Sequence, residues 1–71
     1  MRTISSHDAR AELGELERRW PNVTLIRADD VWSHKGVEYD AVIVDTEGMS
    51  PPQVYLAASR AAHELVVVAH R

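Results

Sequence analysis

Two short runs of consecutive apolar residues constrain the fold of this chain more than any other feature. They span residues 41–44 and 65–69, and neither alternates with polar residues. A strand with one solvated face alternates, so each continuous run predicts a strand covered on both faces, as in a parallel sheet. A helix start lies between them, because Ser50 can cap it, Pro51 suits its first position and Gln53 completes a capping box. These signals predict a strand–helix–strand unit with a right-handed crossover.

A further helix and a further strand are predicted ahead of this unit. Ser5 or Ser6 can cap the start of the helix, and Pro21 would end it by removing a donor and crowding the preceding turn. Between these positions, apolar residues recur at helical spacing: Ala9, Leu13, Leu16 and Trp20. We expect the helix over residues 7–20 and a strand rich in β-branched residues over residues 23–27.

The predicted order of elements is therefore α-β-β-α-β. Residues 50–63 form its second helix, and residues 29–39 and 45–50 form loops. We expect an α/β fold, consisting of a small, mainly parallel sheet of three strands with two helices. The 71 residues make a single domain, residues 1–71, of a size that buries only about 60% of the surface its unfolded chain exposes.

Composition narrows the possible classes of function. The formal net charge of −3 and the 27% of charged residues are typical of a folded globular protein, and they exclude a polybasic nucleic-acid binder. Because cysteine is absent, disulfides and thiolate metal sites are excluded. No apolar run approaches the roughly 20 residues of a membrane span, and no signal-peptide stretch begins the sequence. We expect a cytoplasmic monomer without membrane contacts.

Two segments carry a resemblance to a known family. Residues 35–40 read K-G-V-E-Y-D ahead of an apolar run, and residues 55–68 read Y-L-A-A-S-R-A-A-H-E-L-V-V-V. Together they resemble motifs V and VI of UvrD/Rep-type superfamily 1 DNA helicases. In that family, motif V reads roughly K-G-[LS]-E-[FY]-D, and motif VI reads roughly Y-V-A-[LAV]-[ST]-R-A, three residues, then L-x-V-V. The resemblance covers about residues 23–68 and implies the C-terminal part of the RecA-like domain 2A of a P-loop NTPase fold.

The resemblance also implies roles for four residues. Arg60, expected within the second helix, is the catalytic arginine that contacts the γ-phosphate of ATP, an effect worth about 10³ or more in rate. Lys35 points toward the phosphates, Glu38 accepts hydrogen bonds from the ribose, and Gly36 permits the tight turn that aims both. Taken from the residues alone, Arg60 is more simply a solvated helix arginine. For Lys35 and Glu38, an ordinary polar loop with an exposed ion pair is an interpretation as open as the nucleotide role.

Such a chain is expected to hold only half of an ATP site. It contains no G-x-x-x-x-G-K-[ST] phosphate loop, so ATP with Mg²⁺ is expected to bind only together with helicase domain 1A of a parent protein. Single-stranded DNA is the expected partner of that parent. Two positions depart from the family pattern: Trp32, followed by His34, lies near the usual histidine of motif V, and only His63 can replace the usual basic residue of motif VI.

Two other functions stay open. Asp45 and Glu47 follow a predicted buried strand and resemble the first motif of DnaQ-type 3′–5′ exonucleases, whose carboxylates bind two metal ions. The same fold can also serve as a non-catalytic protein-interaction module. Convergence of Arg60 and Glu38 at the strand ends favours the helicase, and convergence of Asp45 and Glu47 favours the nuclease. The four histidines lack zinc-site spacing, so we expect no metal centre from them.

Overall fold

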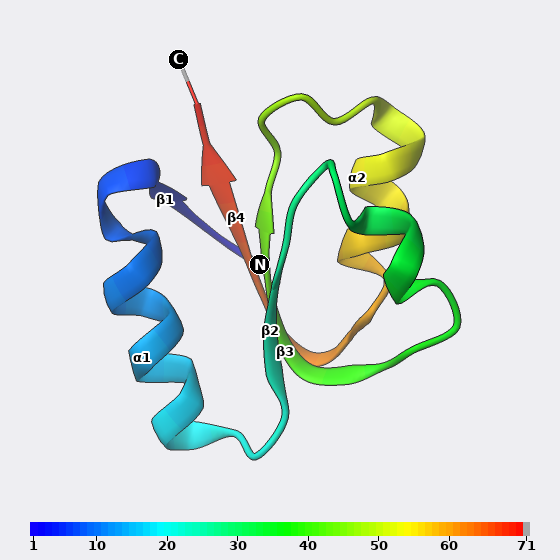
Figure 1. Cartoon of the computed structure of the whole chain (residues 1–71). Helices are drawn as coiled ribbons and strands as arrows, with labels where there is room; N and C mark the ends of the chain where they lie inside the picture. Colours follow the sequence, from blue (N-terminus) through cyan, green and yellow to red (C-terminus); the bar gives the residue numbers. More distant parts are fainter. Residues whose placement is uncertain (71) are drawn as a thin grey trace.

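The computed structural model describes residues 1–70 and shows an α/β domain built on one parallel sheet (Figure 1). The sheet order is β1-β4-β3-β2, and every neighbouring pair is parallel. The strands are β1 (Arg2–Ser5), β2 (Val23–Ile26), β3 (Tyr39–Asp45) and β4 (Ala61–Ala69). The helices are α1 (Ala9–Arg19) and α2 (Pro51–Ala58), with short 3₁₀ turns η1 (Ser6–Asp8) and η2 (Val31–His34). Neither α-helix in the described residues has the length and apolar character needed to cross a membrane.

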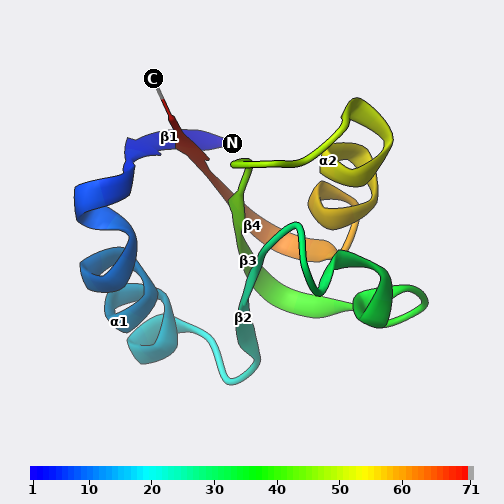
Figure 2. The same cartoon turned by 45° about the horizontal axis from the view of Figure 1, so that its top comes forward.

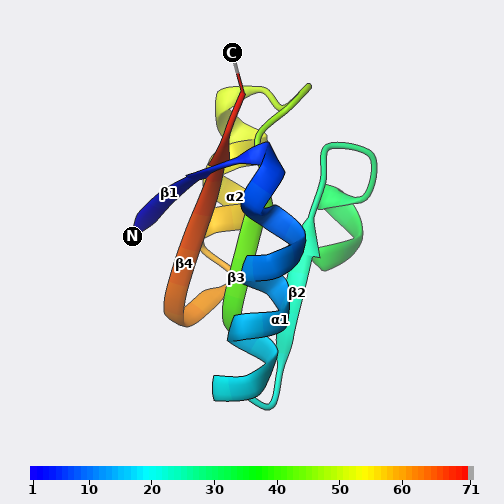
Figure 3. The same ribbon diagram turned by 90° about the vertical axis from the view of Figure 1, so that its left-hand side faces the viewer.

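Helices cover the sheet on both faces, which confirms the expectation drawn from the continuous apolar strands. Figure 3 shows α1 in front of the strands and α2 behind them. The buried side chains accordingly form two clusters. The α1 side contains Leu16, Ala41, Ile43, Val66 and Val68. The other side, beneath α2 and η2, contains Ile26, Val31, Val42, Val44 and Ala57. Alternate residues of β3 therefore enter opposite cores, which is why this strand is apolar throughout.

The sheet has four strands, so the prediction of three was wrong. The missed strand is β1, which pairs in parallel with the end of β4, from Arg2 opposite Val66 to Ser5 opposite Ala69. β1 is an outer strand of the sheet and is mostly exposed, with only Ile4 partly buried. One apolar residue gives no periodic signal, and the pairing depends on residues more than sixty positions later.

The boundary between α2 and β4 also corrects the sequence analysis. The predicted capping box is present, since the Ser50 amide donates to Gln53 Oε1 at 2.7 Å. However, α2 ends at Ala58 and not near residue 63. Alanine favours helices, so the alanines after Arg60 prolonged the helical pattern. Pairing with β3 overrides that propensity and draws these alanines into β4. Arg60 consequently lies in the turn before β4 and not in mid-helix.

An irregularity at the start of β4 brings two of its side chains to Trp20. Tyr39 pairs with Ala61 and Ala41 pairs with Glu64, so β4 carries one extra residue here. Such a bulge re-aims side chains. The Trp20 ring stacks on His63 with centroids 5.0 Å apart, and Trp20 Nε1 donates to Glu64 Oε1 at 2.9 Å.

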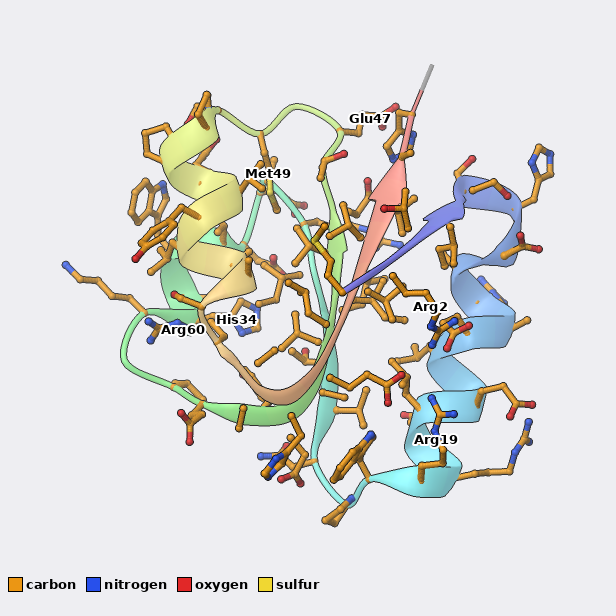
Figure 4. The ribbon with its side chains drawn as sticks, turned by 180° about the vertical axis from the view of Figure 1, so that it is seen from behind. Arg2, Arg19, His34, Glu47, Met49 and Arg60 are labelled. Carbon is orange, nitrogen blue, oxygen red and sulfur yellow. The ribbon has the colours of Figure 1, made fainter. Side chains whose placement is uncertain are left out.

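Glu64 is also the centre of an ion-pair network that joins β1, α1 and β4. Arg2 and Arg19 donate to its carboxylate at 3.1 and 2.9 Å, and Arg2 also pairs with Glu12 at 2.7 Å (Figure 4). The Trp20 hydrogen bond, followed by the two arginines, lowers the pKa of Glu64. The Arg2 hydrogen bond lowers the pKa of Glu12. We call Arg2, Glu12, Arg19, Trp20 and Glu64 the Glu64 network.

Candidate functional site

The two motif segments lie at the same edge of the sheet. Because all four strands are parallel, they begin at one edge, the amino edge, and end at the other, the carboxyl edge (Figure 1). Residues 35–38 directly precede β3, and Arg60 directly precedes β4, which is the neighbour of β3. The sheet topology therefore brings together two segments that are more than twenty residues apart in the sequence, but at the starts of β3 and β4 and not at the strand ends that the sequence analysis named.

A backbone hydrogen bond joins these segments. The Tyr39 amide donates to the Arg60 carbonyl oxygen at 2.8 Å. Glu38 directly precedes Tyr39, so this hydrogen bond also holds the backbone of Glu38 close to Arg60. Figure 4 shows Arg60 at the end of α2, where the chain turns into β4.

Residues 34–37 form a type II β-turn that presents the motif residues. The Val37 amide donates to the His34 carbonyl at 3.0 Å, Lys35 has φ −60° and ψ 128°, and Gly36 has φ +82°. This turn type requires a positive φ at its third residue, which glycine adopts without strain. The tight turn expected at Gly36 is thus present.

The charges on this turn are exposed and unpaired. Lys35 and Glu38 are both exposed. Within residues 1–70, no salt bridge or side-chain hydrogen bond engages either of them, so the ion pair left open by the sequence does not form. Both charged groups are therefore accessible to solvent beside the amino edge.

Arg60 is partly buried and folds back over the end of α2. Its Nε donates to the Leu56 carbonyl at 3.3 Å, and its Nη2 donates to Ser59 Oγ at 3.0 Å. Ser59 Oγ in turn donates to the same Leu56 carbonyl at 2.8 Å. The last carbonyls of a helix lack partners within the helix and carry partial negative charge, so a guanidinium is favourable here. No hydrogen bond within the described residues uses Nη1 of Arg60.

The two acidic residues of the nuclease motif meet at the carboxyl edge, which Figure 2 turns toward the viewer. The Glu47 amide donates to Asp45 Oδ1 at 3.2 Å. Asp45 already has two partners, because His70 Nε2 lies 2.5 Å from Oδ1 and Arg27 Nε lies 3.7 Å from Oδ2. His70 Nδ1 also lies 3.8 Å from Glu47. In residues 1–70, no group of three or more His, Asp or Glu has an arrangement that could hold a metal ion.

Sequence reasoning missed one contact at the amino edge. The Tyr39 hydroxyl and His34 Nδ1 are 2.9 Å apart, and the two rings meet edge to face. His34 Nε2 lies 3.7 Å from Asp30 Oδ2. His34 and Tyr39 flank residues 35–38, but a side-chain bond across five positions in a loop has no recognised spacing pattern. The other histidine noted in the sequence, His63, lies 3.9 Å from Asp40 and stacks on Trp20.

Comparisons with known proteins leave the family of the chain open. A scan against protein-family models found no match. A search of curated proteins found no similar sequence either. What the chain does must therefore be inferred from its own residues.

Proposed function

We propose that this chain is part of an ATP-dependent DNA helicase or translocase and supplies one half of its nucleotide site. The observation that carries the proposal is the meeting of residues 35–38 and Arg60 at the amino edge, linked by the 2.8 Å bond from Tyr39 to Arg60. These are the segments that resemble motifs V and VI. The unpaired state of Lys35 and Glu38 adds support, because an exposed charge without an internal partner is free to contact a ligand.

Each residue has chemistry suited to one part of ATP. The Lys35 ammonium is a mobile positive charge that suits phosphate oxygens. The Glu38 carboxylate is an acceptor for ribose hydroxyls. The Arg60 guanidinium can bind phosphate oxygens with two parallel hydrogen bonds, and on the transferring phosphoryl group it would raise the rate by about 10³ or more. Arg60 would exchange its contacts with Leu56 and Ser59 for the phosphate.

The residues fit one side of a nucleotide and not a complete site. They provide two cations and one ribose acceptor, whereas the sequence has no phosphate loop. A partner domain of the 1A type would supply that loop and the Mg²⁺ ligands. Binding of single-stranded DNA would belong to the assembled parent, because a net charge of −3 gives this chain little attraction for phosphates.

An NMR titration of the ¹⁵N-labelled chain with Mg-ATP tests the proposal. We expect millimolar binding, with amide shifts confined to residues 35–38 and Arg60. Arg60→Ala should weaken this binding by about tenfold, the effect of one charge-assisted contact. Arg10→Ala is the control, because Arg10 is an exposed arginine on α1 and should leave the titration unchanged. Shifts centred on any other surface would contradict the proposal.

The alternative of an interaction module has one observation in its favour. Trp32 is 58% exposed and Tyr55 is 78% exposed, and they belong to η2 and α2, which share one face of the sheet. If Mg-ATP causes no amide shifts in the titration, this alternative is favoured. The nuclease alternative has its own test, since Mn²⁺ should broaden the signals of Asp45 and Glu47 if they bind metal.

A further inference from the structure

Tyr39 makes two contacts that lead to different halves of the proposed site. Its backbone amide donates to the Arg60 carbonyl, and its hydroxyl lies 2.9 Å from His34 Nδ1. The His34 side chain is only 13% exposed, and its Nε2 lies 3.7 Å from Asp30 Oδ2. A polar chain therefore runs from Asp30 through His34 to Tyr39, and from there through the backbone to Arg60. We call the side-chain bond between His34 and Tyr39 the clasp.

The clasp closes the loop that carries Lys35 and Glu38. His34 is the residue before this exposed four-residue segment, and Tyr39 is the residue after it. The clasp holds both ends of the segment, and the type II turn of residues 34–37 overlaps it, so little backbone freedom is left. Holding a binding loop in its bound conformation removes much of the ordering entropy that binding otherwise requires.

We infer that His34 and Tyr39 are positioning residues of the proposed nucleotide half-site. The clasp sets the place of Lys35 and Glu38 relative to Arg60, so that ribose and phosphate contacts are made by an already ordered surface. The identity of the ligand, a nucleoside triphosphate, rests on the proposed function. The ordering of the loop rests on the contacts alone.

The hydroxyl of Tyr39 can be separated from the packing of its ring. The ring lies against the core on the α2 side, whereas the hydroxyl contacts His34. Tyr39→Phe therefore removes the clasp and keeps the apolar contacts. Tyr55→Phe is the matched control, because the Tyr55 side chain is exposed on the outer side of α2.

The experiment compares both variants with the unmodified chain by ¹⁵N relaxation at Gly36, Val37 and Glu38, and by titration with Mg-ATP. Tyr39→Phe should lower the backbone order of these three residues and weaken ATP binding by about three- to tenfold. Tyr55→Phe should change neither quantity. Unchanged order at Gly36 and Val37 in Tyr39→Phe would overturn the inference.

Three further variants test the clasp through His34. His34→Ala should reproduce the effects of Tyr39→Phe, and the double variant should be no worse than either single change, because all three remove the same bond. His34→Asn, whose side-chain amide can replace Nδ1 as the partner of the hydroxyl, should restore much of the loop order. Additive losses in the double variant would show that the two residues act separately.

The two proposals fail in different ways. If the unmodified chain shows no response to Mg-ATP, the proposed function fails, and the relaxation data still decide whether the clasp orders the loop. If ATP binds at residues 35–38 and Arg60 but Tyr39→Phe binds it equally well, the nucleotide role stands and the positioning role is refuted.

Discussion

The Glu64 network and the amino-edge site, which consists of Lys35, Glu38 and Arg60, are both groups of charged residues. They differ in whether their charges are paired within the protein. Glu64 receives hydrogen bonds from Arg2, Arg19 and Trp20, so its carboxylate is saturated by internal partners. Lys35 and Glu38 are exposed on a turn and have no such partners within the described residues. The backbone beneath them is nevertheless held by hydrogen bonds at both ends.

The charges of the Glu64 network join strands and a helix, whereas the charges of Lys35 and Glu38 face solvent. The Glu64 network connects β1, α1 and β4, so its loss should destabilise the fold. Within residues 1–70, no salt bridge or side-chain hydrogen bond joins Lys35 or Glu38 to another element, so loss of their charges should leave stability unchanged. We propose that ordered backbone beneath side chains without partners in the described residues marks the binding surface of this domain.

The largest expected effect tests whether both regions belong to one cooperative unit. Ile43 is fully buried in the middle of β3, the strand that follows residues 35–38 and pairs with the strand that carries Glu64. Ile43→Ala should lower the free energy of unfolding by about 2–5 kcal/mol, because it removes packing and leaves a cavity. Denaturant unfolding followed residue by residue should show the Glu64 network and residues 35–38 melting together. Separate transitions would show that the two regions are independent.

Two glycine-to-alanine substitutions, one in the turn and one in α1, compare the backbone conformations of these two segments. Gly36 has φ +82°, so Gly36→Ala should destabilise by about 1–2 kcal/mol through strain alone, because an added Cβ meets no atom within 4 Å. Gly14 lies inside α1 with equal space around it, and Gly14→Ala should stabilise by up to about 1 kcal/mol. Thermal unfolding of both variants measures this opposite sign, and equal shifts would refute the role of the turn.

A glutamate pair compares the charges directly. Glu64→Gln should lower stability by about 1 kcal/mol, because three donors lose their charged acceptor. Glu38→Gln should change stability by less than about 0.5 kcal/mol, as expected for an exposed residue without a partner. Chemical denaturation gives both numbers. A loss at Glu38 as large as that at Glu64 would remove the distinction between the regions.

The Glu64 network should contribute to the pH dependence of stability. The pKa values of Glu12 and Glu64 are lowered in the folded protein. Their contribution is therefore complete above the ordinary glutamate pKa of about 4.3 and is lost as the pH falls through the lowered values. Unfolding measured between neutral and strongly acidic pH should show a smaller acid loss in Glu64→Gln than in the unmodified chain, and an equal loss in both proteins would contradict the role of this carboxylate.

The sequence predicted the elements whose signals are local and strong. The apolar runs gave β3 and β4, the capping box gave the start of α2, and the helical spacing through Leu16 gave α1 to within two residues at its start and one at its end. β1 could not be predicted, because a four-residue edge strand depends on its partner. The end of α2 was misplaced because alanine propensity yielded to strand pairing after Arg60.

In the candidate site, too, the features that depend on local sequence were predicted and those that depend on tertiary contacts were not. The glycine turn follows from local chemistry, and the position of each motif segment before an apolar strand could be read directly. The clasp between His34 and Tyr39, and the position of Arg60 over the Leu56 carbonyl, required side-chain positions that no spacing rule supplies. The Glu64 network joins residues up to 62 positions apart and depends entirely on the sheet topology.

The place of β4 in the sheet has a consequence for how the chain reaches its native state. β4 is central in the sheet but is the last of the four strands in the sequence, and β1 has no other strand as its neighbour. A chain emerging from the ribosome can form α1 and the β2–β3 pair early, yet β1 must wait until residues 66–69 have been added. Closing so long a loop is slow, since the entropy is lost before the contacts are gained. During that delay the β3 edge that β4 will pair with, and the apolar side chains that will pack against Val66 and Val68, stay open to water. The time just before β4 is completed is therefore when this small domain is most prone to aggregate.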